Sequence, residues 1–337
     1  INLEGGDVNM KVAGVDIGYG FLKIYDGEKY LVIPSVIGNA VDLTFEIKSH
    51  GVNLNNIEVE YDDEKYFVGD LAILQSEHPY RSLSTDRTTD VVVKIMFLTG
   101  LALLTEHSIE SFSVVTGLPV KDYLLYKDTY VQNFTGTHTL FLNGKKKILN
   151  VNKVTVVPQP YGTFCDGLFR ADGSVDEDFA ANHVGIIDIG YKTSDFIQVK
   201  EYNYLERFSS TSANGISSIY KDIANYLATN HSIYKEDYEL ESVIHEGFLR
   251  TRSGKIDIRE ALLKSKKNLA KKIANEIKSL WSNLPEVNLI IVTGGGGSLL
   301  YDQLTELLGE DIVLASEPQM ANVRGYKNWG VYLESDE

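Results

Sequence analysis

Disulfide bonds and membrane-spanning helices both lack a basis in this sequence. Its 337 residues include a single cysteine, Cys165. A lone cysteine excludes an intramolecular disulfide framework and favours a reducing compartment. The longest nearly apolar run, residues 95–104, is interrupted by Thr99 and Gly100. That run is about half of the ~20 residues that a membrane-spanning helix needs. We therefore expect neither disulfides nor a membrane helix.

A secretory leader is also missing from the sequence. Residues 1–9 (INLEGGDVN) contain no basic stretch followed by an apolar one, so they do not resemble a signal peptide. Met10 directly precedes the first strand-like run, and we expect residues 1–9 to be an extension without structural weight. The chain is accordingly expected to be cytoplasmic.

Positive charge is in short supply. The chain has 32 basic and 47 acidic side chains, for a net charge of −15, and a sequence pI near 5.0. This balance argues against broad contact with nucleic-acid phosphates or anionic membrane, because both favour a basic surface. Hydrophobic residues make up 43% and charged residues 23%, fractions typical of a packed globular protein. The length favours two domains.

The chain contains one internal repeat. Residues 14–26 and 185–199 share a plan in which a β-branched run precedes Asp-Ile-Gly-Tyr and a second strand-like run follows. The two Asp-Ile-Gly-Tyr copies begin at Asp16 and Asp188, 172 positions apart. That spacing is half of the chain and far longer than a solenoid repeat. The sequence therefore predicts two duplicated halves.

Strands precede helices in each predicted half. Alternating and β-branched patterns predict strands at 12–16, 21–25, 30–33, 57–61, 65–68, 113–116, 184–188, 193–199, 202–208 and 287–293. Helical periodicity predicts helices at 89–107, 216–229 and 259–281. In the last helix, apolar residues recur at three- and four-residue steps and predict one buried face. The simplest interpretation of its lysines between 264 and 278 is a solvent-exposed face. The alternative is that Lys267 or Lys271 contacts an adenine or ribose.

Three glycine-bearing turns stand where predicted strands end. They follow Asp16, Asp188 and the strand before Gly294–Gly297. Glycine permits positive φ and lets backbone N–H groups approach an anion closely. An Asp at a strand end can hold hydrated Mg²⁺, and Lys23 can return to phosphates as a point charge. A single turn of this kind is most often only a turn, but two near-identical copies and a glycine run together favour a polyphosphate site.

Other site chemistries find little support. The seven His are scattered, with no His-Glu-x-x-His and no paired Cys, so no zinc site is indicated. No Gly-x-Ser-x-Gly occurs, which removes the commonest hydrolase nucleophile turn. The run Gly294–Gly297 is not a Walker loop, because Ser298 and Leu299 follow it instead of Lys and Ser or Thr.

With these motifs, the sequence resembles the actin-like ATPase superfamily, which includes Hsp70 chaperones and sugar kinases. The resemblance covers residues 10–332, with five signature regions in family order: 16–23, 156–167, 188–196, a softer match at 212–215, and 290–300. It is most similar to bacterial plasmid-segregation actins (ParM or StbA type) and their archaeal relatives. The features that carry this are DIGYG followed by Lys23, YLVIPSVIG, PQPYG and the Thr-Ser-Asp that ends the second loop.

The resemblance implies an α/β fold of the actin/Hsp70/sugar-kinase, ribonuclease H-like kind, with two duplicated domains around a nucleotide cleft. Domain I would comprise residues 10–165 and 320–337, with a small subdomain at about 38–90. Domain II would comprise residues 166–319, with a small subdomain at about 216–282.

The same resemblance implies roles for individual residues. Gln159 would orient the attacking water and Asp188 would help polarise it, while Asp16 and Asp188 would hold the hydration shell of Mg²⁺. The implied nucleotide contacts are Gly18, Tyr19, Gly20, Lys23, Gly190, Tyr191, Lys192, Thr193, Gly294, Gly295, Gly296 and Gly297. Tyr19 departs from the family, where a small hydroxyl residue is common. Its duplicate Tyr191 is a candidate to pack under its own hairpin. Taken from the residues alone, Gln159 between Pro158 and Pro160 is equally compatible with an extended surface residue.

The function implied is a slow ATPase, using ATP or GTP with Mg²⁺, that forms head-to-tail filaments and moves or segregates plasmid DNA through an adaptor. The net charge of −15 disfavours direct DNA contact. Two alternatives stay open: a monomeric small-molecule kinase of the same fold, and a nucleotide-gated scaffold with little turnover. A kinase would need an additional carboxylate base facing the γ-phosphate, and the sequence does not identify one.

Overall fold

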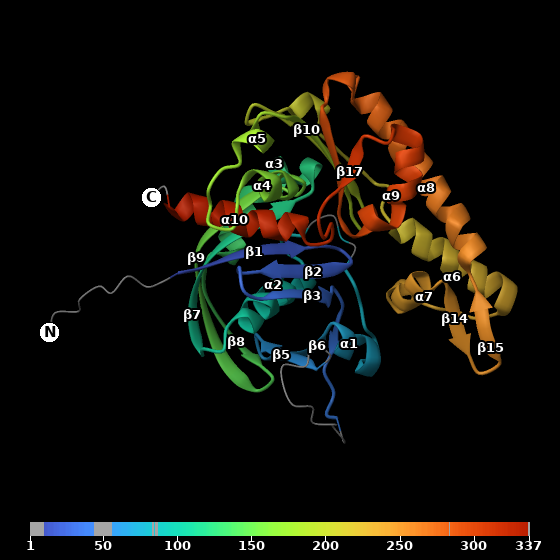
Figure 1. Cartoon of the computed structure of the whole chain (residues 1–337). Coiled ribbons are helices and arrows are strands. Elements are labelled where there is room, and N and C mark those ends of the chain that lie inside the picture. Colours follow the sequence, from blue (N-terminus) through green and yellow to red (C-terminus); the bar gives the residue numbers. More distant parts are fainter. Residues whose placement is uncertain (1–9, 44–55, 83, 85–86, 283, 336–337) are drawn as a thin grey trace. The chain divides into compact units, whose positions relative to one another are not determined.

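The computed structural model describes residues 10–43, 56–82, 84, 87–282 and 284–335. They form two compact units (Figure 1). Unit 1 is built from the described parts of Ile1–Leu118, Asp122–Asp176 and Val323–Glu337, and unit 2 from Pro119–Lys121 and Glu177–Asn322. The expected extension at residues 1–9 lies outside the described residues, as does part of the expected small subdomain at 38–90.

Unit 1 is organised by a nine-stranded sheet with the order β3-β2-β1-β7-β9-β8-β5-β6-β4. The strands are β1 Lys11–Ile17, β2 Phe21–Tyr25, β3 Tyr30–Pro34, β4 Ile37–Asn39, β5 Ile57–Tyr61, β6 Glu64–Val68, β7 Ile109–Leu118, β8 Gly136–Leu142 and β9 Lys145–Pro158. Its helices are α1 Asp70–Gln75, α2 Val91–Leu104, α3 Val120–Phe134, α4 Tyr161–Leu168 and the C-terminal α10 Ala321–Ser335, of which α3 and α10 begin on residues assigned to unit 2.

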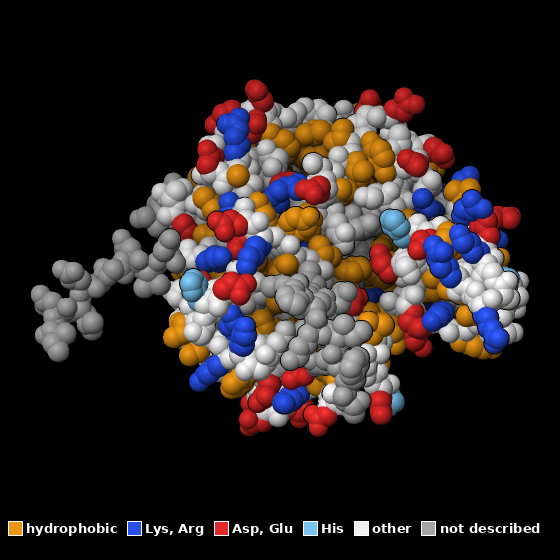
Figure 2. Space-filling model, turned by 60° about the horizontal axis from the view of Figure 1, so that its bottom comes forward, with side chains coloured by type: hydrophobic (Ala, Val, Ile, Leu, Met, Phe, Trp, Pro, Cys, Tyr) orange, Lys and Arg blue, Asp and Glu red, His pale blue; other side chains and the backbone are white. Residues whose placement is uncertain are grey.

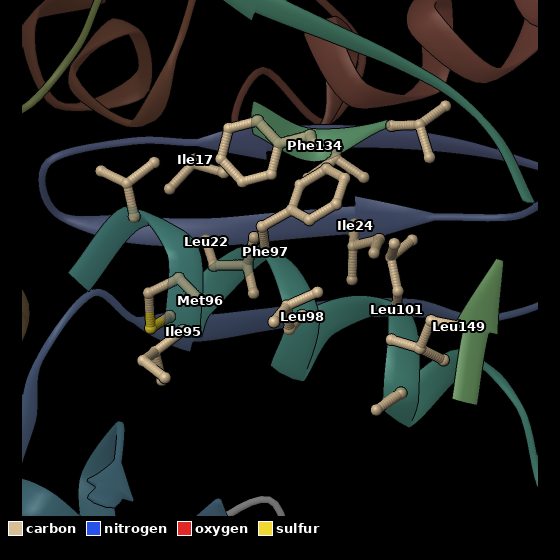
Figure 3. Close-up of a cluster of buried hydrophobic side chains, with 14 of the residues drawn as sticks. Ile17, Leu22, Ile24, Ile95, Met96, Phe97, Leu98, Leu101, Phe134 and Leu149 are labelled. Carbon is tan, nitrogen blue, oxygen red and sulfur yellow. The ribbon is translucent and has the colours of Figure 1, made fainter. Parts of the chain in front are cut away.

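Helix α2 forms the core of unit 1. Residues on nearly all sides of this helix are buried, as expected for a helix that is apolar all round. Gly100 faces β2, since a Cβ there would lie 3.0 Å from a Leu22 methyl and 3.1 Å from an Ile24 methyl. The Phe97 ring lies against Phe134, with ring centres 4.2 Å apart (Figure 3). The helix begins where the Asp90 carboxylate accepts a hydrogen bond from Val92 N at 2.9 Å, an N-cap interaction. The packing of α2 thus supports β1 and β2, the two strands that the first Asp-Ile-Gly-Tyr turn joins.

Unit 2 contains a second sheet, β12-β11-β10-β16-β17, with β13 paired to β11, and a separate β14–β15 hairpin. The strands are β10 His183–Ile189, β11 Ser194–Lys200, β12 Asn203–Tyr204, β13 Ser210–Ser212, β14 Phe248–Thr251, β15 Gly254–Asp257, β16 Leu289–Thr293 and β17 Ile312–Leu314. The α-helices are α5 Glu177–Ala180, α6 Ser217–His231, α7 Glu241–Glu246, α8 Arg259–Leu280 and α9 Gly295–Leu308. Three 3₁₀ turns lie at Glu206–Phe208, Asp237–Glu239 and Leu284–Glu286.

The two sheets repeat one topology. The order β3-β2-β1-β7-β9 of unit 1 corresponds to β12-β11-β10-β16-β17 of unit 2. In each, the first strand pairs antiparallel with the strand that follows it and parallel with a later one. Strands β1 and β10 are offset by 172 residues at both ends. The strand order therefore confirms that the sequence repeat is a structural one.

Most predicted elements match the structure, with one clear error. Strands β2 and β5 have the predicted bounds, and α8 begins at the predicted residue. The strand predicted at 202–208 is wrong, because β12 is two residues long and a 3₁₀ turn follows. Glu201 and Tyr202 have left-handed φ of 50° and 64°, so the chain reverses there. The β8–β9 and β14–β15 hairpins were not predicted.

Helix α8 has the predicted two-sided character. Leu269, Ile273 and Ile277 are buried and so is Trp281, which follows the helix, whereas Leu262 is half-buried. The lysines on the opposite side are exposed, except for Lys266, which is half-buried. Among the helices of the described residues, none combines the length and the apolar character needed to cross a membrane.

Candidate functional site

The first Asp-Ile-Gly-Tyr turn joins β1 to β2 in unit 1. Gly18 N donates to Phe21 O at 2.9 Å, and a Cβ on Gly18 would lie 2.8 Å from that same oxygen. Ser35 holds the turn from the side of β3: its Oγ donates to Gly18 O at 2.8 Å, and its N donates to Gly20 O at 2.9 Å. The loop is thus fixed by its own backbone and requires glycine at position 18.

Asp16 brings two other predicted residues together. The β1–β2 register places Lys23 opposite Asp16, and the Lys23 Nζ lies 2.8 Å from Asp16 Oδ2. The Gln159 side-chain amide donates to the other oxygen, Oδ1, at 2.9 Å. Asp16 is only 2% exposed, so the pair with Lys23 and the amide compensate a nearly dry carboxylate. Unit 1 therefore assembles a carboxylate, a cation and an amide at one point.

Gln159 is held in place by its backbone as well. It lies between β9 and α4, where its N donates to Leu118 O at 2.8 Å. Its own carbonyl accepts from the Tyr326 hydroxyl of α10 at 2.9 Å. A Cβ on Gly117 would lie 2.0 Å from that hydroxyl, so the absence of a side chain there makes room for Tyr326. Gln159 is half-buried and hydrogen-bonded through its backbone and its side chain, so it is not an extended surface residue.

The Tyr19 side chain turns into unit 1. It is 8% exposed, its hydroxyl donates to Ser84 O at 3.1 Å, and the Arg87 guanidinium stacks 4.4 Å from the ring centre. Because these contacts occupy the Tyr19 side chain, any contact that Tyr19 makes with a phosphate would come from its backbone N–H group. The nearby Tyr130 is fully buried, and this burial raises the pKa of Tyr130 to about 12.

The second Asp-Ile-Gly-Tyr turn joins β10 to β11 in unit 2. Gly190 N donates to Thr193 O at 2.9 Å, which repeats the Gly18 bond of the first turn. The start of α6 packs on this loop, since Ser217 N donates to Tyr191 O at 2.7 Å. A Cβ on Gly215 would lie 2.4 Å from the Lys192 carbonyl carbon. The half-buried Lys192 thus belongs to a loop that is wedged against α6.

The side chains of this second loop have partners within unit 2. Tyr191 is 8% exposed; its hydroxyl bonds to the Asp237 carboxylate, and its ring meets Tyr220 edge-on at 5.3 Å. The Tyr191 side chain is therefore buried against α6 and the 3₁₀ turn at Asp237–Glu239, and not under its own hairpin. The Thr193 hydroxyl donates to Asp195 Oδ2 at 3.2 Å.

Asp188 lies beside the glycine run. It is 7% exposed, and its Oδ2 accepts from the Asn322 amide at 2.6 Å. A Cβ on Gly294 would lie 2.3 Å from Asp188 Oδ1, and Gly294 has φ of +82°. Position 294 thus needs glycine twice, for its backbone conformation and for the close approach of the carboxylate.

The glycine run opens helix α9. Gly294 is the N-cap and Gly295 begins the helix. A Cβ on Gly296 would lie 2.5 Å from a methyl of Ile189, and one on Gly297 would lie in ordinary contact at 3.4 Å. A Cβ on Gly295 would find its nearest atom 4.0 Å away. This open side and the free N–H groups of a helix N-terminus suit the approach of a nucleotide phosphate.

Two residues of this site escaped prediction. Asp195 stands opposite Asp188 in the β10–β11 register, where Lys23 stands opposite Asp16. Its carboxylate accepts from Val120 N at 2.9 Å and from the Thr211 hydroxyl. The repeat itself could have revealed it, because Asp195 follows Lys23 by the same 172 positions. Asn322 carries no motif, and sequence patterns offered no means of finding it.

The donor chemistry of the two aspartates fits hydrated Mg²⁺. No group of three or more His, Cys, Asp or Glu side chains that could cage a metal occurs in the described ranges. Mg²⁺ keeps several waters and binds through one or two carboxylates plus substrate phosphates. Each carboxylate oxygen has two lone pairs, so Asp16 and Asp188 can accept from metal-bound water while keeping their Gln159 and Asn322 partners.

Cys165 takes no part in this chemistry. It is fully buried on α4, and burial, aided by the nearby Asp166 charge, raises the pKa of its thiol well above the usual value. The thiolate is the reactive form, so this cysteine is an inert core residue.

Two family models match the chain. Residues 14–162 match the model described as Actin like proteins N terminal domain. Residues 186–306 match the model described as Archaeal actin homologue MreB-like, C-terminal. Together they span most of the sequence and include both Asp-Ile-Gly-Tyr turns. No curated protein sequence matched the chain.

Solved structures with this fold include filament-forming and nucleotide-bound proteins. A 15-stranded ParM filament from Clostridium botulinum is 24% identical with a TM-score of 0.82, covering 96% of this chain and 99% of that one. The archaeal actin homologue Ta0583 in complex with ADP is 17% identical with a TM-score of 0.77, covering 95% and 99%. Bacillus thuringiensis ParM with AMPPNP is 18% identical with a TM-score of 0.72, covering 97% and 99%.

The likeness to these structures shows the fold, and the family models agree with the expected superfamily over both halves. The chain thus contains an actin-like N-terminal domain at residues 14–162 and an archaeal MreB-like C-terminal domain at residues 186–306.

Proposed function

We propose that this protein binds ATP or GTP with Mg²⁺, hydrolyses it slowly and assembles into head-to-tail filaments that move or segregate plasmid DNA. The observation that carries the proposal is the assembly at Asp16, where Lys23 lies 2.8 Å and the Gln159 amide 2.9 Å from the two carboxylate oxygens. The repeated turn at Asp188 supplies the second half. Relatives solved with ADP, with AMPPNP and as a filament support it.

Unit 1 would supply charge and orientation. The Lys23 ammonium offsets negative charge that develops on the transferred phosphoryl group. The Gln159 amide orients the attacking water without acting as a strong base, so catalysis is mainly positioning and electrostatics. Asp16 fixes both side chains through its two oxygens. Such a site favours slow turnover, which suits a timer better than a metabolic enzyme.

Unit 2 would supply the second phosphate loop. Asp188 would polarise the attacking water, and Asp16 and Asp188 would hold the hydration shell of Mg²⁺, which would supply neutralisation of phosphate charge. The backbone N–H groups of the second turn and the N-terminus of α9 bind phosphate oxygens, and Gly295 leaves space for the adenosine beside α9.

Filament assembly requires a heterologous contact that does not close on itself. Plasmid DNA would attach through an adaptor protein, because the net charge of −15 opposes direct binding to phosphates. The protein would act in the cytoplasm.

Mg-ATP-dependent assembly tests the proposal. Light scattering and pelleting are measured after addition of Mg-ATP over a range of protein and salt concentrations, with phosphate release followed in parallel. We expect polymer to form and slow phosphate release to accompany it. The absence of polymer under all conditions would refute the filament.

The same experiment separates the two alternatives. A kinase would transfer phosphate to an added metabolite and stay monomeric. A nucleotide-gated scaffold would bind ATP tightly, with phosphate release no faster than that of a variant carrying Asp188→Ala.

A further inference from the structure

Helix α8 carries an unneutralised stripe of positive charge. It has seven basic and two acidic residues in a chain whose net charge is −15. Five of its lysines, which we call the lysine stripe, are exposed: Lys264, Lys267, Lys271, Lys272 and Lys278. Four of them recur at steps of three, four and seven residues, so they line one face of the helix, opposite its buried side. Figure 2 shows lysine and arginine side chains on the right of the view, with acidic side chains among them.

Most carboxylates near this stripe are engaged elsewhere, and the exception is Glu260 in the first turn of α8. In the part of the chain that the structure describes, no lysine of the stripe forms an ion pair. The ion pairs in this region of unit 2 join Lys235 to Glu239, Arg250 to Glu246 and Arg259 to Asp257. Glu276, the one acidic residue among the lysines, accepts from the Asn214 amide at 2.7 Å. Like charges at such spacing destabilise a helix. A stripe of five exposed lysines with two carboxylates on its helix, in a chain with excess carboxylates, is the surface that an acidic partner would complete.

A polar groove borders the stripe. It lies between α6 and α8, has a volume of about 420 Å³, and includes Lys264, Asn268, Asn225 and Asn230 in its lining. The Asp222 carboxylate at its edge is already bonded to the Ser265 hydroxyl at 2.5 Å. The Asn230 amide already donates to Tyr226 O at 3.0 Å, so the groove offers the Lys264 ammonium and the amides of Asn225 and Asn268 as donors to a ligand.

Unit 1 exposes a surface of the opposite sign on the β5–β6 hairpin. We call Glu58, Glu60, Asp62, Asp63 and Glu64 the acidic hairpin. The last three are exposed, and the hairpin's one lysine, Lys65, lies 4.0 Å from Glu60. The excess negative charge acts on its neighbour: burial raises the pKa of Tyr66, and the charges of Glu64 and Asp62 raise it further.

We propose that the lysine stripe of one copy binds the acidic hairpin of a second copy of this chain. Charge complementarity favours this occupant over DNA. Outside α8 the chain has a net charge of −20, so a second copy brings carboxylates, whereas a DNA duplex would face repulsion from the rest of the molecule. The lengths also agree, at about 21 Å for the stripe and about 17 Å for a five-residue strand of the hairpin.

This contact joins unit 2 of one molecule to unit 1 of the next. Such a contact is heterologous and can repeat along an open assembly. The inference rests on the self-association part of the proposed function and assigns it a surface. Because exposed charge pairs are screened by salt, assembly through this contact weakens steeply as ionic strength rises.

Two charge-reversed variants test the contact. The stripe variant carries Lys264→Glu, Lys272→Glu and Lys278→Glu, and it leaves Lys267 and Lys271 unchanged because either could contact an adenine or ribose. The hairpin variant carries Glu58→Lys, Glu60→Lys and Glu64→Lys, and leaves Asp62 and Asp63 unchanged because both have positive φ. A control with the same change in net charge as the stripe variant carries Lys121→Glu, Arg170→Glu and Lys200→Glu, three exposed positions outside α8, the β5–β6 hairpin and the strand β8 that pairs with it.

Each reversed variant alone should raise the protein concentration needed for assembly at least tenfold, and the control less than twofold, with nucleotide binding unchanged in all three. Mixed in equal amounts, the two reversed variants should co-assemble at close to the wild-type concentration, since every contact in an alternating polymer is then complementary. This rescue also shows that both variants are folded.

Three results would overturn the inference: a stripe variant that assembles like the control, a mixture without rescue, or loss of duplex-DNA binding by the stripe variant with assembly intact. If the wild type forms no polymer, the filament proposal fails, and sedimentation velocity at low salt still decides the contact. The mixture should then associate while each variant alone does not; absence of that association refutes the contact.

Discussion

The two Asp-Ile-Gly-Tyr hairpins have the same backbone and opposite electrostatics. In each, the glycine after the aspartate donates to the carbonyl three residues on, at 2.9 Å. The residue opposite Asp16 is Lys23, whereas the residue opposite Asp188 is Asp195. The first hairpin neutralises its aspartate across the strand pair. The second brings two carboxylates to one face, with the Asn322 amide on Asp188 and the Val120 N–H group on Asp195.

The difference teaches that one duplicated scaffold can hold two unlike half-sites. Backbone hydrogen bonds set the shape of each turn, while a single position on the second strand sets its charge. A lysine in unit 1 suits contact with phosphate, and a second carboxylate in unit 2 leaves Asp188 without a lysine opposite it in the strand pair. Asp188 is accordingly the better candidate to accept from water.

Removal of the ammonium from the first hairpin should have the largest effect. Lys23→Met leaves the Asp16 charge buried, since the two side chains are only 13% and 3% exposed. Loss of one partner of a buried pair destabilises by about 3 kcal/mol, which urea unfolding measures. Lys23→Arg, which keeps the charge, should cost much less. A loss below about 1 kcal/mol for Lys23→Met would contradict the pairing.

Crowding beside Asp188 should give the next largest effect. Gly294→Ala places a Cβ 2.3 Å from Asp188 Oδ1 at a φ of +82°, so we expect a loss of about 2 kcal/mol in thermal or urea unfolding together with weaker nucleotide binding. Gly295→Ala is the matched control, because its Cβ would find its nearest atom 4.0 Å away. Equal effects of the two substitutions would show that Gly294 does not approach Asp188 closely.

The carboxylate that distinguishes the second hairpin should contribute less. Asp195→Asn keeps an acceptor for Val120 N but removes the charge assistance to that bond and to the Thr211 hydroxyl. Charge-assisted hydrogen bonds are roughly twice as strong as neutral ones, so stability should fall by about 1 kcal/mol. A variant more stable than wild type would instead indicate that repulsion between Asp195 and Asp188 dominates.

The smallest predicted effect is a pH dependence at the far end of the first hairpin. Burial opposes ionisation of Asp26, but the backbone N–H groups of Lys29 and Glu28 and the Lys11 ammonium outweigh it and lower the pKa of Asp26 below its ordinary 3.8. The stabilisation is present above that ordinary pKa and is lost as pH falls through the folded-state value. Asp26→Asn should lower the free energy of unfolding by about 0.5 kcal/mol at pH 7 and by less at pH 3, as measured by urea unfolding at both pH values. An equal loss at the two pH values would show that the Asp26 charge does not contribute to stability.

The sequence alone predicted the parts of the site that lie close together in the chain. Lys23 follows Asp16 by seven residues, and a tight hairpin between them brings the two side chains to one face, as the structure shows. The glycines were predictable for the same reason, because a turn at a strand end requires their backbone freedom.

Partners that arrive from distant segments could not be predicted. Asn322 reaches Asp188 across 134 residues, and Tyr326 reaches Gln159 across 167. Both depend on how α10 packs, which no local pattern encodes. The inward turn of Tyr19 likewise depends on Ser84 and Arg87. These partners depend on tertiary packing, whereas the strands could be predicted from local sequence periodicity.

If Asp188 serves catalysis on a bound nucleotide, its removal should slow phosphate release far more than it weakens nucleotide binding. Phosphate release and Mg-ATP affinity are compared for wild type and Asp188→Ala, with Asp195→Asn as the neighbouring carboxylate control. We predict that Asp188→Ala retains nucleotide binding within about fivefold while phosphate release falls at least a hundredfold, and that Asp195→Asn releases phosphate at close to the wild-type rate. Unchanged phosphate release by Asp188→Ala would contradict the account.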